Sequence, residues 1–153
     1  MSKKFKFALQ PVLEHRKRIE DEKQQVVAIR SRAFEEAKAE LERLHEEFRA
    51  CAGALHELHR RLGSEDLRLH YAHLQFLDRT IEAQGRLVDE RREALDRARG
   101  DLVEASKERK VVDKLKERRR VAFVAEEMRM EQKELDDGNA RRHARAHKSG
   151  EAS

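Results

Sequence analysis

The chain has 153 residues, of which 43% are charged and only 5% are aromatic. This composition excludes a thick globular core and is typical of long helices and coiled coils. Disordered chains have a similar composition, so the periodicity of the apolar residues must decide between the two. The 35 basic and 31 acidic residues alternate along the chain, which indicates a solvated, ion-paired surface rather than a nucleic-acid-binding patch.

The first predicted helix covers about residues 9–62. Small or apolar residues recur there at the a and d positions of a heptad, as expected for a coiled coil and not for a disordered chain. These residues are Phe34, Leu41, Phe48, Leu55 and Leu62 at a, with Ala37, Leu44, Cys51 and Leu58 at d. Upstream, the pattern is expected to slip by one residue, to Val12, Ile19, Val26 and Ala33. Pro11 suits the first turn of this helix, where its missing N–H costs little.

A turn is predicted at residues 63–64, in the stretch "RLGSEDL". Gly63 can adopt the left-handed conformation that ends a helix, and Ser64 can cap the next one. Glu65 and Asp66 would then place negative charge in the first turn of the second helix, where the helix dipole favours it.

The second predicted helix covers about residues 65–136. Its seam is apolar at a and more polar at d, and polar seam residues usually fix register at some cost in stability. The a residues are Leu67, Leu74, Ile81, Val88, Leu95 and Leu102, and the d residues are His70, Leu77, Gln84, Arg91, Ala98, Ala105 and Val112. Further apolar residues support the helix to about residue 136, namely Val121, Phe123, Val124, Met128, Met130 and Leu135. Residues 138–153 form a basic tail that we expect to be disordered.

Folding the chain at the turn aligns the two seams antiparallel. Leu58 then faces Leu67, Cys51 faces Leu74, Phe48 faces Leu77, and Leu44 faces Ile81. Leu41 would face Gln84, and Phe34 would face the stem of Arg91. The fold class is therefore all-α, with residues 1–137 forming a two-helix antiparallel coiled-coil hairpin. Alternatively, the same seam residues could pack between chains, in an intermolecular bundle with one continuous helix per chain.

No motif for catalysis, cofactor binding or metal binding is found. There is no phosphate-binding glycine loop, no Cys/His cluster with metal spacing and no nucleophile with a base. His56, His59, His70 and His73 would gather near the turn, but only His70 occupies a seam position. The single cysteine, Cys51, is read as a small seam residue in a reducing compartment. The chain has no signal-peptide core and no membrane-spanning stretch, so we expect a cytosolic protein.

Three stretches resemble the family of the flagellar export protein FliJ. The N-terminal "FKFALQPVLEHR", the segment "HLQFLDRTIEAQ" after the turn, and "KLKERRR" followed by "EQKELDD" occur in the family's order. The resemblance covers about residues 3–140. It implies a non-enzymatic stalk and adaptor of the flagellar type III export apparatus, peripheral to the cytoplasmic face of the membrane at the flagellar base. Implied partners are the hexameric export ATPase FliI, the export-gate membrane protein FlhA and, in some members, export chaperones.

The resemblance also suggests contact residues. The family's gate-contacting surface corresponds to His73, Leu77, Thr80 and Gln84, although His73 stands where an aromatic residue is usual. For the ATPase we expect contacts from Arg16, Arg18, Arg118 and Arg119, because a basic end of the hairpin suits a ring pore lined by acidic groups. Three other functions remain open: the equivalent stalk of a virulence secretion system, a nucleic-acid-associated coiled coil and a generic scaffold.

Overall fold

The computed structural model describes residues 3–61 and 63–151, which fold into two α-helices. Helix α1 covers Gln10–Leu58 and helix α2 covers Ser64–Glu151. The chain divides into two compact units. Unit 1 comprises Met1–Lys17 and Lys107–Ser153, and unit 2 comprises Arg18–Ser106. The all-α helical hairpin expected from the heptads is confirmed.

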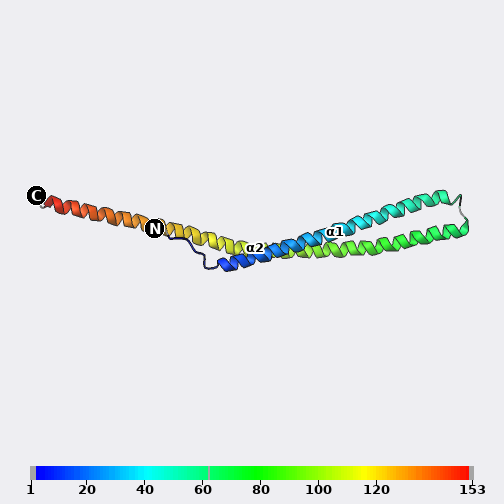
Figure 1. The fold of residues 1–153 in the computed structure, drawn as a ribbon, viewed down its shortest axis with the longest axis horizontal. Coiled ribbons are helices and arrows are strands. Elements are labelled where there is room, and N and C mark those ends of the chain that lie inside the picture. Colours follow the sequence, from blue (N-terminus) through cyan, green and yellow to red (C-terminus); the bar gives the residue numbers. More distant parts are fainter. Residues whose placement is uncertain (1–2, 62, 152–153) are drawn as a thin grey trace. The chain divides into compact units, whose positions relative to one another are not determined.

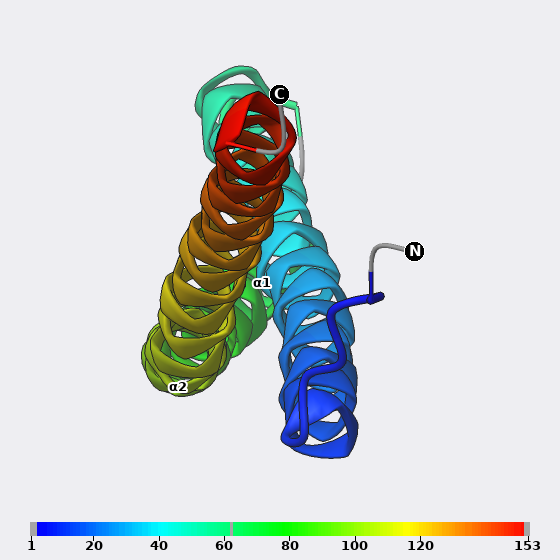
Figure 2. The ribbon, with the colours of Figure 1, turned by 90° about the vertical axis from the view of Figure 1, so that its left-hand side faces the viewer.

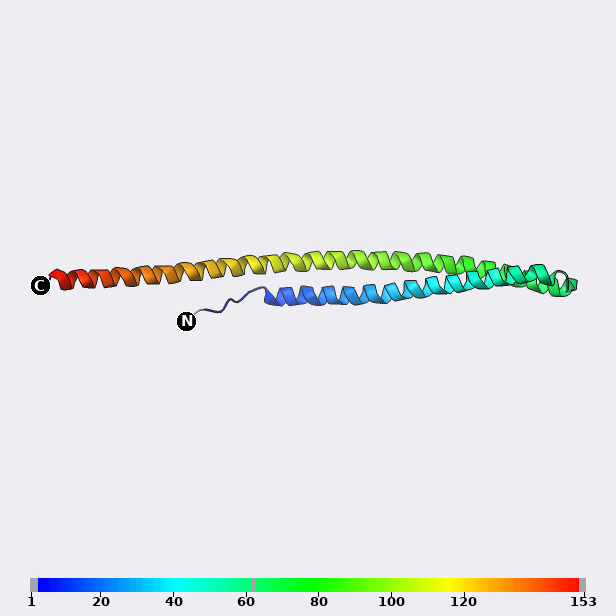
Figure 3. The same cartoon turned by 90° about the horizontal axis from the view of Figure 1, so that it is seen from above.

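In unit 2 the two helices lie side by side and antiparallel (Figures 1 and 3). Every buried hydrophobic residue of the described part of this unit occupies a predicted a or d position. These residues are Ala37, Leu44, Leu55, Leu77, Val88, Leu95, Ala98 and Ala105. Burial of each valine or leucine among them contributes about 1.5–3 kcal/mol and burial of each alanine contributes less, so this narrow seam supplies the main stabilisation of the unit.

The expected slip of the seam upstream of Phe34 is wrong. Val12 and Val26 are 40% and 39% exposed, whereas Leu13 is fully buried. The strict seven-residue repeat therefore continues backwards from Phe34 through Val27, Glu20 and Leu13. The slip was expected because a straight helix drifts against a strict seven-residue repeat. The repeat is kept here although it places Glu20 at the seam, since a long side chain can lay its methylene stem over a seam while its carboxylate reaches water.

The connection between the helices is longer than predicted. Helix α1 ends at Leu58, and residues 59–61 form a turn. The amide N–H groups of Arg60 and Arg61 donate to the carbonyls of Glu57 and Leu58 at 3.3 and 3.0 Å, which tightens the end of the helix. Paired helices are separated by about 8–10 Å, and the residues after Leu58 supply the chain that crosses this distance. Leu62, the last expected seam residue of the first helix, lies outside the described residues.

The start of α2 differs from the predicted cap. The N–H of Leu67 donates to the carbonyl oxygen of Gly63 at 3.2 Å, so Gly63 is the N-cap residue and Ser64 begins the helix. None of the described glycines has a positive φ, so the expected left-handed conformation of Gly63 is not observed. Glu65 and Asp66 do lie in the first turn of α2, as predicted.

The tail expected to be disordered is helical as far as Glu151. The segment contains no proline and is rich in alanine and arginine, which are strong helix formers. Just before it, Arg129 pairs with Glu126 at 2.8 Å and Gln132 donates to Asp136 at 3.2 Å. Such pairs one turn apart stabilise a helix without any tertiary partner.

Candidate partner-binding surfaces

In unit 1 residues 3–7 form an extended segment that precedes α1 (Figure 2), and their aromatic side chains contact residues of α2. The rings of Phe5 and Phe123 lie 5.6 Å apart between their centroids, in a tilted arrangement. Phe7 is only 8% exposed, and the guanidinium of Arg119 lies 5.7 Å from the centroid of its ring. Gln10 then begins α1, with its N–H donating to the carbonyl of Phe7 at 3.1 Å. These aromatic contacts hold the N-terminal segment on the basic part of α2.

The basic residues of unit 1 differ in how far their charge is compensated. Arg16 is paired with Glu108 at 2.6 Å, and Arg120 is paired with Glu117 at 2.7 Å. The hydrogen bond from Arg120 lowers the pKa of Glu117, which keeps this carboxylate ionised. Arg118 and Arg119 are exposed and form no ion pair within the part of unit 1 that the structure describes. Their two charges are therefore available to an acidic partner, although the guanidinium of Arg119 also lies over the ring of Phe7.

Of the four arginines expected to contact an ATPase, the structure brings three into unit 1: Arg16, Arg118 and Arg119. Arg18 is exposed and belongs to unit 2. Arg16 is half-buried, and its guanidinium already binds a carboxylate of the same unit. Of the four predicted arginines, Arg118 and Arg119 are therefore the ones best placed to contact an ATPase through unit 1.

Unit 1 also carries an exposed apolar surface on α2, formed by residues whose spacing predicted only that the helix continues. Its residues follow helical spacing and are 42–66% exposed: Val121, Val124, Met128 and Leu135. Isolated exposed apolar residues are ordinary, but four of them on one helical face resemble the anchors with which a helix enters a groove. In the sequence, this surface could have been recognised from the helical spacing of these apolar residues, which continues beyond the end of the coiled-coil seam.

The four residues expected to contact the export gate lie along α2 in unit 2, but they face different surroundings. Leu77 is 2% exposed and belongs to the seam. Gln84 is half-buried, and its Nε2 donates to the carbonyl oxygen of Ala37 at 3.0 Å. The Thr80 hydroxyl is half-buried and donates to the carbonyl of Phe76 at 2.8 Å. Only His73 is fully on the surface.

His73 has an aromatic neighbour on this exposed face. Its ring stacks on Phe76 with 6.5 Å between the centroids, and its Nε2 lies 3.8 Å from a carboxylate oxygen of Glu47 on α1. Phe76 is 60% exposed. It occupies an outward heptad position, which was the available signal that it does not serve the seam. A partner at this surface would contact the aromatic ring of Phe76 before it reached Leu77.

No group of three or more His, Cys, Asp or Glu residues in the ranges 3–61 and 63–151 is arranged to hold a metal ion. None of the described helices combines the length and the apolar character needed to cross a membrane. Cys51 is half-buried and not disulfide-bonded.

These features define an antiparallel two-helix hairpin protein whose accessible side chains are suited to binding other proteins. The chain belongs to the flagellar FliJ protein family, whose profile matches residues 5–148. No curated protein matches the sequence. A solved structure with the same fold is that of CT670 from Chlamydia trachomatis, described as a candidate YscO homologue. It is 22% identical, with a TM-score of 0.54 over 92% of this chain and 96% of that chain.

Proposed function

We propose that this protein is a non-enzymatic stalk and adaptor of the flagellar type III export apparatus. The observation that carries the proposal is the match to the flagellar FliJ family over residues 5–148. The hairpin fold supports it, because stiff paired helices can transmit force or position between two partners. In this role the protein would act on the cytoplasmic face of the membrane at the flagellar base, without spanning it.

The first proposed partner is the hexameric export ATPase, FliI. Unit 1 would provide the contact, since it combines the exposed charges of Arg118 and Arg119 with the apolar surface formed by Val121, Val124, Met128 and Leu135. Apolar anchors flanked by uncompensated arginines suit a partner whose groove or pore is apolar and rimmed by carboxylates. Binding there would promote assembly of the ATPase ring.

The second proposed partner is the export gate, FlhA, at the exposed face of α2 in unit 2. His73 and Thr80 remain the predicted contacts, together with the neighbouring ring of Phe76. Leu77 and Gln84 would influence this contact indirectly, because both hold α2 against α1. Export chaperones are further candidate partners of the adaptor.

Binding to the purified export ATPase tests the first contact. Arg118→Glu reverses an exposed charge without breaking an ion pair, and Leu135→Asp disrupts the apolar surface. We expect each variant to bind at least about tenfold more weakly, as is usual for anchor residues. The matched control is Arg49→Glu, which reverses an exposed charge in unit 2. Equal losses in all three variants, or preferential binding to a virulence-system ATPase, would contradict the proposal.

A further inference from the structure

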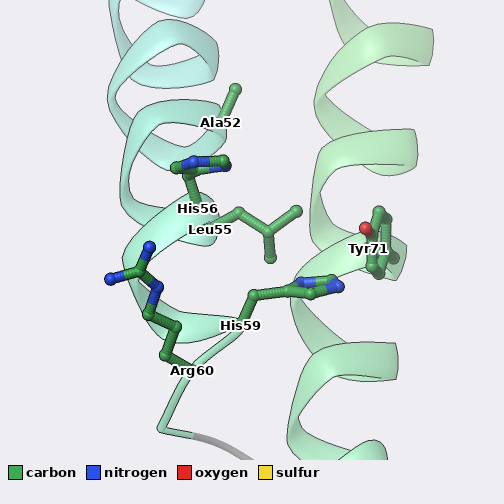
Figure 4. A pocket seen from close by; sticks show the side chains of 6 residues that line it. All are labelled: Ala52, Leu55, His56, His59, Arg60 and Tyr71. Atoms are coloured by element: carbon green, nitrogen blue, oxygen red, sulfur yellow. The ribbon is translucent and has the colours of Figure 1, made fainter.

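A cavity of about 430 Å³ lies beside the turn of unit 2. Most of its wall comes from the last turns of α1 and the residues after it, and α2 contributes one side chain (Figure 4). Its lining consists of Ala52, Leu55, His56, His59, Arg60 and Tyr71. We call this cavity the tip pocket.

The tip pocket has an apolar floor and a polar rim. Leu55 is 9% exposed and extends from α1 towards α2, with Ala52 one turn away on the same helix (Figure 4). The ring of His59 meets the ring of Tyr71 edge-on, with 6.2 Å between the centroids and an interplanar angle of 83°. This contact joins the two sides of the pocket and fixes the position of the Tyr71 ring, which is half exposed.

The rim of the pocket carries hydrogen-bond donors and no carboxylate. Arg60 offers up to five N–H donors in a fixed fork and has no acceptor, while the two imidazoles and the phenol can also donate. Arg60 is exposed and forms no ion pair among the described residues. His56 and Arg60 also line a neighbouring cavity, together with Glu57 and Arg61, but neither Glu57 nor the acidic residues Glu65 and Asp66 of α2 line the tip pocket itself. The pocket therefore presents unmatched donors above an apolar floor.

We propose that the tip pocket binds a short acidic segment of a partner protein, in which a carboxylate is followed closely by an aliphatic side chain. The carboxylate would bind the fork of Arg60 in a bidentate manner, a geometry that arginine favours. The aliphatic side chain would pack on Ala52 and Leu55, and the edge of Tyr71 would close the far side. The apolar floor favours such a segment over a free phosphate, which has no group to place there. This assignment is independent of the proposed stalk function, since it uses none of the surfaces assigned to the ATPase or the gate.

A pair of synthetic peptides tests the tip pocket with the full-length protein. The probe is a fluorescein-labelled peptide of alternating Asp/Glu and Leu residues, and its twin carries Asn and Gln in place of the acids. We expect saturable binding of the acidic peptide by fluorescence anisotropy, weakening as ionic strength rises, and binding at least about tenfold weaker for the twin.

Two variants test the role of Arg60 in this pocket. Arg60→Gln should weaken binding of the acidic peptide by about tenfold or more, because the change removes a charge-assisted hydrogen bond. Arg61→Gln is the matched control, since Arg61 does not line the tip pocket, and it should change the affinity for the peptide by less than about threefold.

Several outcomes would overturn the proposal. Equal binding of the two peptides, or equal effects of Arg60→Gln and Arg61→Gln, would show that the rim does not recognise the carboxylate. Competition by inorganic phosphate alone at the same concentration as the peptide would assign the pocket to a phosphate instead. Self-association in sedimentation that Arg60→Gln abolishes would identify a second copy of this chain as the occupant. Circular dichroism of each variant checks that the helices are retained, so that a loss of binding reports on the pocket.

Discussion

The side chain of Gln84 on α2 donates a hydrogen bond of 3.0 Å to the main-chain carbonyl of Ala37 on α1. Gln84 occupies a seam position and is half-buried, and Ala37 is 7% exposed. A carbonyl within a helix has a second lone pair, so it can accept this bond without losing its own helical one. The bond forms in only one alignment of the two helices, and it therefore specifies the register of unit 2.

Replacing Gln84 with leucine should raise the stability of unit 2, because a seam position that specifies register does so at a cost. We expect Gln84→Leu to stabilise by about 1 kcal/mol and Gln84→Ala to destabilise by a similar amount. Urea unfolding of the full chain, followed by circular dichroism, measures both changes. A Gln84→Leu variant less stable than Gln84→Ala would contradict the assigned role.

Leu13 and the Arg16–Glu108 ion pair should contribute very differently to unit 1. Leu13 is fully buried, so Leu13→Ala should cost about 2–5 kcal/mol. The side chains of Arg16 and Glu108 are 38% and 53% exposed, and solvent screening should limit their coupling to less than about 1 kcal/mol. A double-mutant cycle with alanine at both positions measures the coupling directly. A coupling energy between Arg16 and Glu108 larger than the stability lost in Leu13→Ala would contradict this prediction.

Acid should weaken the helices through three carboxylates. Side-chain hydrogen bonds from Arg43, Arg120 and Arg129 lower the pKa of Glu40, Glu117 and Glu126, respectively. A carboxyl group with a lowered pKa in the folded state binds fewer protons there than in the unfolded state. Its contribution is thus fully present above the ordinary carboxyl pKa of about 4.3 and is lost as pH falls through the lowered value.

Thermal midpoints measured at a series of pH values test this linkage. We expect the midpoint to decline below pH about 4.3, with a shallower decline in Arg43→Gln, which can no longer lower the pKa of Glu40. Because the three pairs are on the surface, the difference between the variants should be small. A steeper decline in Arg43→Gln would show that the sign of the linkage is wrong.

The C-terminal part of α2 should open easily. Residues 139–151 are exposed throughout, and a helix without a packed face is only marginally stable. We expect their amides to exchange with deuterium far faster than those around Val88 and Leu95 in the seam of unit 2. Hydrogen exchange with mass spectrometry resolves the two regions. Equal protection would mean that the terminal helix is stabilised by a partner, such as a second copy of the chain.

The seam of unit 2 could be predicted from the sequence because a heptad requires only that apolar residues repeat. The pairing of Phe34 with the stem of Arg91 stays a prediction, and the structure adds a contact that was not predicted, since the guanidinium of Arg92 lies 5.6 Å from the centroid of the Phe34 ring. Long side chains reach diagonally across a seam, and heptad counting does not capture that reach. The register upstream of Phe34 was predicted wrongly, because the sequence alone does not show whether a helix keeps a strict seven-residue repeat or drifts against it.

The N-terminal contact was missed although its signal was present. Phe5 and Phe7 alternate in a segment that precedes the helix, and an extended chain places alternate side chains on one side. Where such a segment packs depends on tertiary contacts with Phe123 and Arg119, which lie more than a hundred residues away. Exposure of partner-binding residues is similarly a property of the packed helices. It separates His73 and Thr80 from Leu77, which the resemblance to the FliJ family had grouped together.

The most direct test of the stalk function is the rate of ATP hydrolysis by the purified export ATPase from the same organism, with and without this protein. The proposal predicts a higher rate together with hexamer formation, and no such increase with the Leu135→Asp variant. An unchanged rate with the helical, full-length protein would contradict it.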